Sequence, residues 1–135
     1  MGAVNVIEYI TIANTGNVTD FGDLSAIAQF NSGLSSPTRG IFTIATSAVN
    51  TIEYITIAIT GNSTDFGNLT AVREDTAGIS SPTRGVFGGG LNTDGNEVNI
   101  IEYITIASTG NATDFGDLSA SKAYGGSSSN GHGGL

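Results

Sequence analysis

The chain of 135 residues contains no cysteine, no tryptophan and few positive charges. Without cysteine it can form neither disulfide bonds nor thiolate metal sites. Four Lys and Arg stand against twelve Asp and Glu, and the net charge of −8 disfavours nucleic acid and anionic membranes, which need clustered cations. No apolar run reaches the ~18 residues of a membrane-spanning helix, and the first residues lack the basic and apolar regions of a signal peptide. We therefore expect no nucleic-acid partner, no transmembrane segment and no signal peptide.

Histidine is equally scarce. His132 is the one histidine, and it lies in a Gly/Ser-rich tail that we expect to be mobile at its end. One histidine cannot build a metal centre or a nucleophile-base pair by itself, so the expected state of His132 is a solvated tail residue. The sequence predicts no catalytic residue, no metal and no cofactor.

What the sequence has in abundance is repetition. The heptapeptide Ile-Glu-Tyr-Ile-Thr-Ile-Ala begins at Ile7, Ile52 and Ile101, at spacings of 45 and 49 residues. Each copy is followed by Thr-Gly-Asn and then by Thr-Asp-Phe-Gly-Asp/Asn-Leu. Self-similarity at this period is typical of one supersecondary unit used several times, in which each copy buries its apolar surface against its neighbours.

Each unit predicts four short strands with turns between them. Residues 4–13 are rich in β-branched and aromatic types and are apolar on both faces, which indicates a strand covered on two sides. Thr-Gly-Asn predicts a tight turn because these residues tolerate positive φ, and Pro-Thr-Arg-Gly predicts a second turn. The expected strands are 4–13, 18–24, 25–36 and 41–45, with 71–81 and 86–87 in the second unit and 119–128 in a further one. The predicted fold class is all-β and antiparallel.

The segment from Arg73 to Gly90 resembles the kelch repeat, whose second strand ends in a double glycine. Here that strand reads Arg-Gly-Val-Phe-Gly-Gly, while the first unit has Thr43-Ile44 in place of the glycines. Phe stands where kelch repeats usually carry Trp. The longer repeated motif, together with Ser-Ser-Pro-Thr-Arg-Gly, resembles repeats in structural proteins of marine bacteriophages and in ocean metagenomes.

This resemblance implies kelch-like β-propeller blades, each a four-stranded antiparallel sheet. The chain would be a single repeat domain, 1–135, with about two and a half to three blades. The expected parts are a half-blade at 4–24, blades at 25–69 and 70–118, and a C-terminal strand with a Gly/Ser tail at 119–135.

An array of this length leaves the broad face of each end blade uncovered. Because propellers have ~4 to 8 blades, a homodimer forming a six-bladed ring fits better than three chains making nine. The alternative is that the chain is a piece of a longer array.

The repeated residues are candidates for structural roles rather than for catalysis. Repetition gives every carboxylate pair the same environment. Glycoside hydrolysis instead needs two carboxyl groups in different environments, which give them different pKa values. Arg39 and Arg84 recur in equivalent turns and are expected to pair with a nearby carboxylate. Aspartates Asp20, Asp65 and Asp114 are expected to fix a turn through their own backbone. The repeat-defining residues are Glu8, Tyr9, Phe21, Arg39, Glu53, Tyr54, Phe66, Arg84, Glu102, Tyr103 and Phe115.

Two further segments carry weak likenesses to known sites. The loop 92–97 has some calcium-loop residues but lacks the full ligand spacing, so a hairpin loop is the favoured interpretation. Gly88-Gly89-Gly90 is followed by neither Lys-Ser/Thr nor a predicted helix, so it does not indicate a phosphate-binding loop.

For function, the resemblance implies a non-enzymatic structural or binding module, a phage virion appendage that recognises a host-surface protein or glycan. It also implies a virion-associated or otherwise soluble bacterial or phage location. The alternative is a carbohydrate-active enzyme built on a propeller; against it, the chain has no Trp for aromatic platforms and only symmetric acids.

Overall fold

The computed structural model describes residues 2–45 and 49–129. The described part consists of strands, turns and loops, and it contains no helix. All strand pairs are antiparallel, so the predicted all-β, antiparallel class is confirmed. His132 lies outside the described residues.

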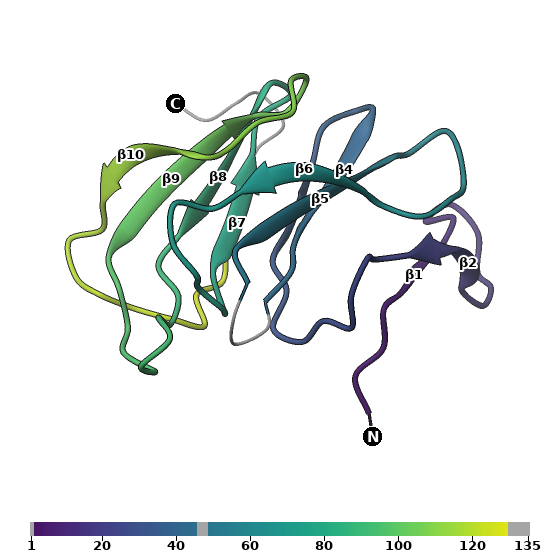
Figure 1. Ribbon diagram of the computed structural model, residues 1–135. Helices are drawn as coiled ribbons and strands as arrows, with labels where there is room; N and C mark the ends of the chain where they lie inside the picture. Colours follow the sequence, from purple (N-terminus) through teal and green to yellow (C-terminus); the bar gives the residue numbers. More distant parts are fainter. Residues whose placement is uncertain (1, 46–48, 130–135) are drawn as a thin grey trace.

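Within the described residues, ten strands form one two-stranded hairpin and two four-stranded sheets (Figure 1). The N-terminal hairpin pairs β1 (Val6–Tyr9) with β2 (Thr19–Asp23). The first sheet has the order β3-β4-β5-β6, and the second sheet has the order β10-β9-β8-β7. Strands of the first sheet are β3 (Gly33–Ser35), β4 (Arg39–Thr43), β5 (Thr51–Thr56) and β6 (Thr64–Asn68). Strands of the second sheet are β7 (Ala77–Ser80), β8 (Arg84–Gly88), β9 (Ile100–Thr105) and β10 (Thr113–Asp117).

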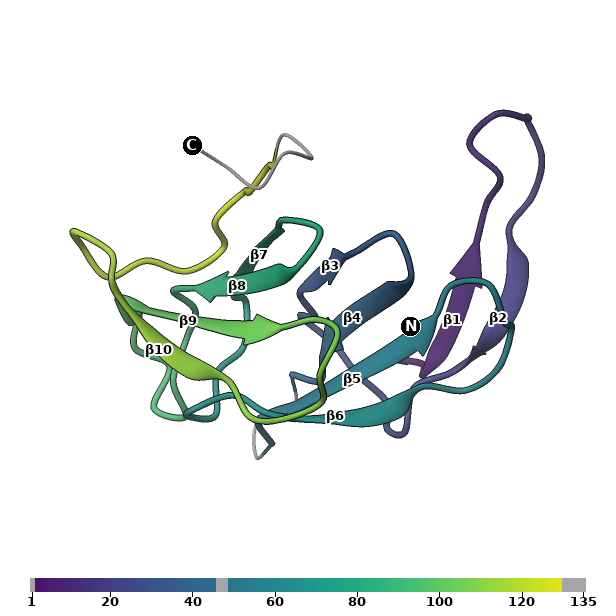
Figure 2. The ribbon, with the colours of Figure 1, turned by 90° about the horizontal axis from the view of Figure 1, so that it is seen from above.

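The hairpin and the two sheets lie side by side in chain order, as Figure 2 shows from above. The first strands of the two sheets, β3 and β7, approach each other closely: a Cβ added at Gly78 would meet the carbonyl oxygen of Gly33 at 2.9 Å. The array is open, because the described residues form no closed ring.

Apolar side chains fill the two spaces between neighbouring sheets. Residues Ile41, Ile52 and Phe66 of the first sheet pack against Phe87 and Ile104 of the second. A second cluster joins the N-terminal hairpin to the first sheet, through Ile7, Phe21, Leu24, Ile44 and Ile55. The core is therefore made between sheets, as expected for units that cannot bury their apolar faces alone.

Equivalent positions of the units share unusual backbone dihedral angles even where their side chains differ. Phe30, Asp75 and Tyr124 have φ of 57°, 55° and 55°, although positive φ is uncommon outside glycine. The register of each hairpin β1–β2, β5–β6 and β9–β10 also shifts at the same place, beside a glycine of positive φ. The repeat is thus a repeat of backbone conformation as well as of sequence.

Several strand predictions were wrong. The strands predicted at 25–36 and 71–81 are limited to β3 (Gly33–Ser35) and β7 (Ala77–Ser80). The strand predicted at 4–13 is limited to Val6–Tyr9, since no strand of the described residues pairs with the outer edge of β1, whereas β5 pairs with β4 as far as Thr56. The strand predicted at 119–128 does not form. That segment has no second strand of its own unit to pair with among the described residues, and it is rich in Gly and Ser.

Candidate functional site

Two of the three repeated glutamates are fully enclosed in the sheets. Glu53 of β5 and Glu102 of β9 are 2 % and 0 % exposed. An ionised carboxylate at such a depth is costly unless it is paired and hydrogen-bonded. Their contacts therefore decide whether they could react with a substrate.

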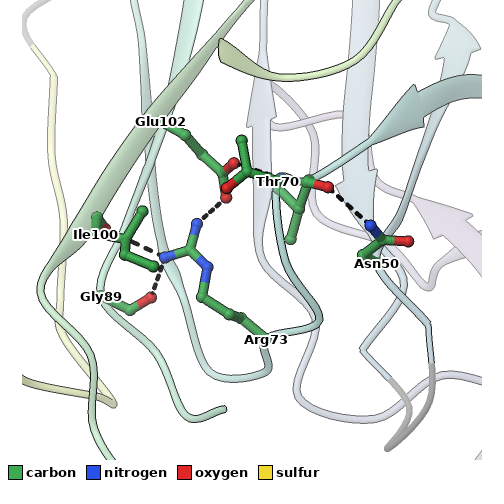
Figure 3. A network of polar contacts seen from close by, with 7 residues as sticks. Asn50, Thr70, Arg73, Gly89, Ile100 and Glu102 are labelled. Carbon is green, nitrogen blue, oxygen red and sulfur yellow. Dashed lines mark hydrogen bonds and ion pairs between the residues drawn. The ribbon is translucent and has the colours of Figure 1, made fainter. Parts of the chain in front are cut away.

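Glu102 is held by a buried arginine, Arg73 (Figure 3). The Arg73 guanidinium forms an ion pair with the Glu102 carboxylate and also donates to the carbonyl oxygens of Gly89 at 2.6 Å and Ile100 at 3.2 Å. The backbone N–H of Thr70 donates to the other Glu102 oxygen at 2.7 Å. Burial lowers the pKa of Arg73 to about 10, so the guanidinium keeps its charge at neutral pH. The pair ties the segment before β7 to the middle of the second sheet.

The first sheet satisfies the equivalent glutamate with neutral donors. Ala28 occupies the position of Arg73 in the repeat, and Glu53 instead accepts hydrogen bonds from the backbone N–H of Ser25 and from the hydroxyls of Ser25 and Ser63. Both buried glutamates thus act as structural acceptors at the centre of a sheet.

Glu8, the third glutamate, differs from the other two. It lies in β1 and is exposed, and its carboxylate forms no hydrogen bond or ion pair with any residue that the structure describes. Among residues 2–45 and 49–129, none donates to the Glu8 carboxylate as Ser25 donates to that of Glu53 and Thr70 to that of Glu102.

Sequence reasoning missed the role of Arg73. A signal was present, because Glu53 and Glu102 are each flanked by Ile and Tyr in strands that are apolar on both faces. A carboxylate in such a strand requires a buried partner, and Arg73 is the one cation in the segment that precedes β7.

The tyrosines and phenylalanines of the repeat form three matched pairs. Tyr54 and Phe66 meet edge to face with ring centroids 6.0 Å apart, and Tyr9–Phe21 and Tyr103–Phe115 repeat this geometry at the same distance. Phe66 is buried by the neighbouring sheet, but Phe115 at the C-terminal side is 55 % exposed.

Arg39 and Arg84 do not pair with a carboxylate in the described structure, contrary to the prediction. Arg39 lies over the ring of Tyr54, 4.4 Å from its centroid, and Arg84 lies over Tyr103 at 4.5 Å. The ring faces attract the guanidinium charge. Arg39 also donates to the carbonyl oxygen of Ile106 at 2.7 Å, which links the first sheet to the second.

The Thr-Gly-Asn segments lie in longer loops than the tight turns that were predicted, and they connect neighbouring sheets. Gly110 N–H donates to Phe66 O at 2.7 Å, Asn111 Oδ1 accepts from Asn68 N–H at 3.1 Å, and Ala112 N–H donates to Asn68 O at 2.8 Å. We call these three hydrogen bonds the latch. The loop 57–63 makes the same latch to the N-terminal hairpin, from Gly61, Asn62 and Ser63 to Phe21 and Asp23.

A glycine on the receiving strand makes the latch possible. Gly67 has φ of +149°, and a Cβ there would lie 2.3 Å from Gly110 O. Gly22 is equally close to Gly61 O, whereas a Cβ at Gly116 would meet nothing within 4 Å. The aspartates Asp20, Asp65 and Asp114 lie within β2, β6 and β10 and so do not fix turns, contrary to the prediction.

The serine-rich turns border an open groove of about 300 Å³ at the β3 and β7 side of the array. No charged residue lines it, and its lining residues are Ser35, Ser36, Pro37, Ser80, Ser81, Pro82 and Ser129. The hydroxyl of Ser36 accepts from the backbone N–H groups of Thr38 and Arg39, and Ser81 repeats this pattern in the next turn. The groove therefore presents small neutral polar groups on two turns that are closed by serine hydrogen bonds.

The remaining motifs have structural explanations. In the loop 92–97, Asn92 Oδ1 accepts from the backbone N–H of Asp94 and Asn96 and so closes a turn. Residues 2–45 and 49–129 contain no group of three or more His, Cys, Asp or Glu that could hold a metal ion. Cβ atoms at Gly89 and Gly90 would meet Lys122 O and Glu74 O at 2.3 Å and 2.6 Å, so these glycines allow close backbone approach.

A search for membrane-spanning helices in the described part of the chain found none of sufficient length and apolarity. In comparisons with known proteins, no family model and no curated protein matched the chain.

Proposed function

We propose that the chain is a non-enzymatic structural and binding module in which each four-stranded sheet is one blade of a kelch-like propeller. The twofold use of the same latch supports this proposal, since neighbouring blades of a propeller meet through one repeated geometry. The buried state of Glu53 and Glu102 also favours a structural use of the repeated acids.

The ring is completed by a second copy of the chain. One chain supplies three blade positions, and two chains supply six, which is within the usual range of ~4 to 8 blades. The uncovered apolar side chains at the two sides of the array, such as Ile12 and Phe115, support association between copies.

The ligand of this module is a glycan on a host-cell surface, and the module is a virion appendage. The observation that carries this proposal is the uncharged groove between the Ser-Ser-Pro turns. Neutral hydroxyl-rich ligands suit such a surface, whereas the net charge of −8 opposes anionic ones. The resemblance of the repeats to those of marine phage structural proteins favours the virion location.

The test is binding of the full chain to an array of bacterial surface polysaccharides. Ser35→Lys places a long charged side chain in the groove and should weaken binding of any recognised glycan at least tenfold. Ser108→Lys is the matched control, since Ser108 is exposed in a loop outside the groove. Equal loss in both variants, or glycan binding that Ser35→Lys leaves unchanged, would overturn the assignment of the groove.

A further inference from the structure

The contact between the first and second sheets has three components. Apolar side chains meet at its centre, where Phe66 of the first sheet and Ile106, which follows β9, are 2 % and 1 % exposed. Arg39 reaches across to Ile106 O, and the latch joins β6 to the loop 106–112.

Each side of the array carries one unmatched half of this same contact. On the C-terminal side, the second sheet presents Phe115, the exposed Arg84 and the open space at Gly116. In the repeat, Arg84 is equivalent to Arg39, 45 residues earlier. Phe115 and Gly116 are equivalent to Phe66 and Gly67, 49 residues earlier. These residues of the second sheet are the receiving half of the contact.

The N-terminal hairpin presents the other half. Ile12 is 93 % exposed, while Ile106, its equivalent in the repeat, is 1 % exposed. Ile10 and Val18 are also exposed, although their equivalents Ile104 and Ala112 are buried. Gly16 and Asn17 hold the positions of the latch residues Gly110 and Asn111.

We infer that the N-terminal hairpin of a second copy docks on the second sheet in the geometry that joins the first sheet to the second within the chain. Gly16 N–H then donates to Phe115 O, Asn17 Oδ1 accepts from Asp117 N–H, and Arg84 donates to the Ile12 carbonyl. This inference rests on the proposed ring and assigns the residues of its interface.

The segment 119–129 supports a second copy over any other occupant. Lys122 N–H donates to Val98 O at 3.1 Å, as Ala28 N–H donates to Val4 O at 3.5 Å in the equivalent place. Ser127 Oγ donates to Gly78 O at 2.7 Å. The segment therefore already follows the path of the next unit beside the second sheet, although it forms no strand.

The next unit would then be shared between two copies. Lys122 stands 49 residues after Arg73, and Glu8 stands at the position of Glu102. Docking places the Lys122 ammonium of one copy near the Glu8 carboxylate of the other, as Arg73 lies near Glu102 in the second sheet. The exposed Glu8 and the exposed Lys122 each gain an opposite charge in this way.

The first test is the solution mass of the full chain across a concentration series. The expected mass is twice 13.6 kDa at high concentration. Ile12→Lys should shift the association midpoint by at least a hundredfold, whereas Ile59→Lys should leave it within threefold. Ile59 is a matched control because it is also an exposed isoleucine and its equivalents are the polar Asn14 and Ser108. A mass of one chain at all concentrations, or equal effects of the two variants, would overturn the inference.

The second test exchanges charges between copies. Glu8→Lys and Lys122→Glu should each weaken self-association, and an equimolar mixture of the two variants should associate more tightly than either alone. In a mixed pair both interfaces regain opposite charges, which no structural role of either residue within one chain would produce. Failure of the mixture to recover association would refute the pairing of Glu8 with Lys122.

The interface, the six-position ring and the glycan groove can each fail separately in these experiments. If masses larger than two chains form and Ile12→Lys still abolishes them, the interface stands and the six-position ring does not. If the two-chain mass and its variants behave as expected but no glycan binds, the assignment of the groove fails alone.

Discussion

Replacement of Arg73 by methionine removes the positive charge from the centre of the second sheet and retains much of the apolar volume. In the native chain the guanidinium makes an ion pair with Glu102 and hydrogen bonds to Gly89 and Ile100. The variant leaves Glu102, which is 0 % exposed, with the Thr70 N–H as its one remaining donor among the described residues.

The expected loss is large because a carboxylate then remains buried without a countercharge. Removal of one partner of a buried ion pair costs about 3–5 kcal/mol. Since small domains have a total stability of about 5–15 kcal/mol, this loss is a large fraction of the free energy of unfolding. The free energy of unfolding is measured by urea titration. Far-UV circular dichroism follows the transition, because the chain has no tryptophan to report by fluorescence.

A second substitution separates charge from packing. Adding Glu102→Gln to Arg73→Met replaces the stranded carboxylate by a neutral amide and should recover at least about 2 kcal/mol, because the buried charge is gone. Lys122→Met, measured at concentrations where the chain is monomeric, should change stability by less than about 0.5 kcal/mol since Lys122 is exposed. A loss below about 1 kcal/mol for Arg73→Met, or additive losses in the double variant, would refute the reasoning.

Two further comparisons use equivalent positions of the repeat, measured on the monomer. Phe66→Ala should lower the free energy of unfolding by about 3–5 kcal/mol, whereas Phe115→Ala should cost less than about 1 kcal/mol, since Phe66 is buried and Phe115 is 55 % exposed. Equal losses in urea titrations would contradict the assigned contact between the sheets. Gly67→Ala should be more destabilising than Gly116→Ala, because both glycines have positive φ but a Cβ at Gly67 alone would meet a carbonyl oxygen, that of Gly110 at 2.3 Å. Thermal melts in which the two variants coincide would indicate that φ, rather than the close approach, decides the cost.

The central strands and the Pro-Thr-Arg-Gly turns of this chain could be predicted from its sequence because the relevant signals are local. Runs of Ile, Val, Thr and Tyr indicated the strands that became β5 and β9, and Pro-Thr-Arg-Gly indicated the turn between β7 and β8. The extent of β1 could not be predicted in this way, since it depends on whether a neighbouring strand is present.

The polar contacts were harder to foresee because they join residues far apart in the chain. Arg73 and Glu102 are 29 residues apart, and Arg39 reaches Ile106 across 67 residues. We expected Arg39 and Arg84 to pair with carboxylates, but Tyr54 and Tyr103 lie on the strands adjacent to theirs and offer ring faces instead. Similarly, Thr-Gly-Asn carried a local turn signal that gave no indication of the latch to the preceding sheet.

The latch has a consequence for how the gene of such a protein can change. Five of its six hydrogen-bonding atoms belong to the backbone, and the sixth is the Asn side chain that all three units carry. The hydrogen bonds of the latch can therefore form between any two successive units that keep this Asn. Unequal recombination between the coding segments of the repeated motif would add or remove whole units while retaining the latch residues at each junction.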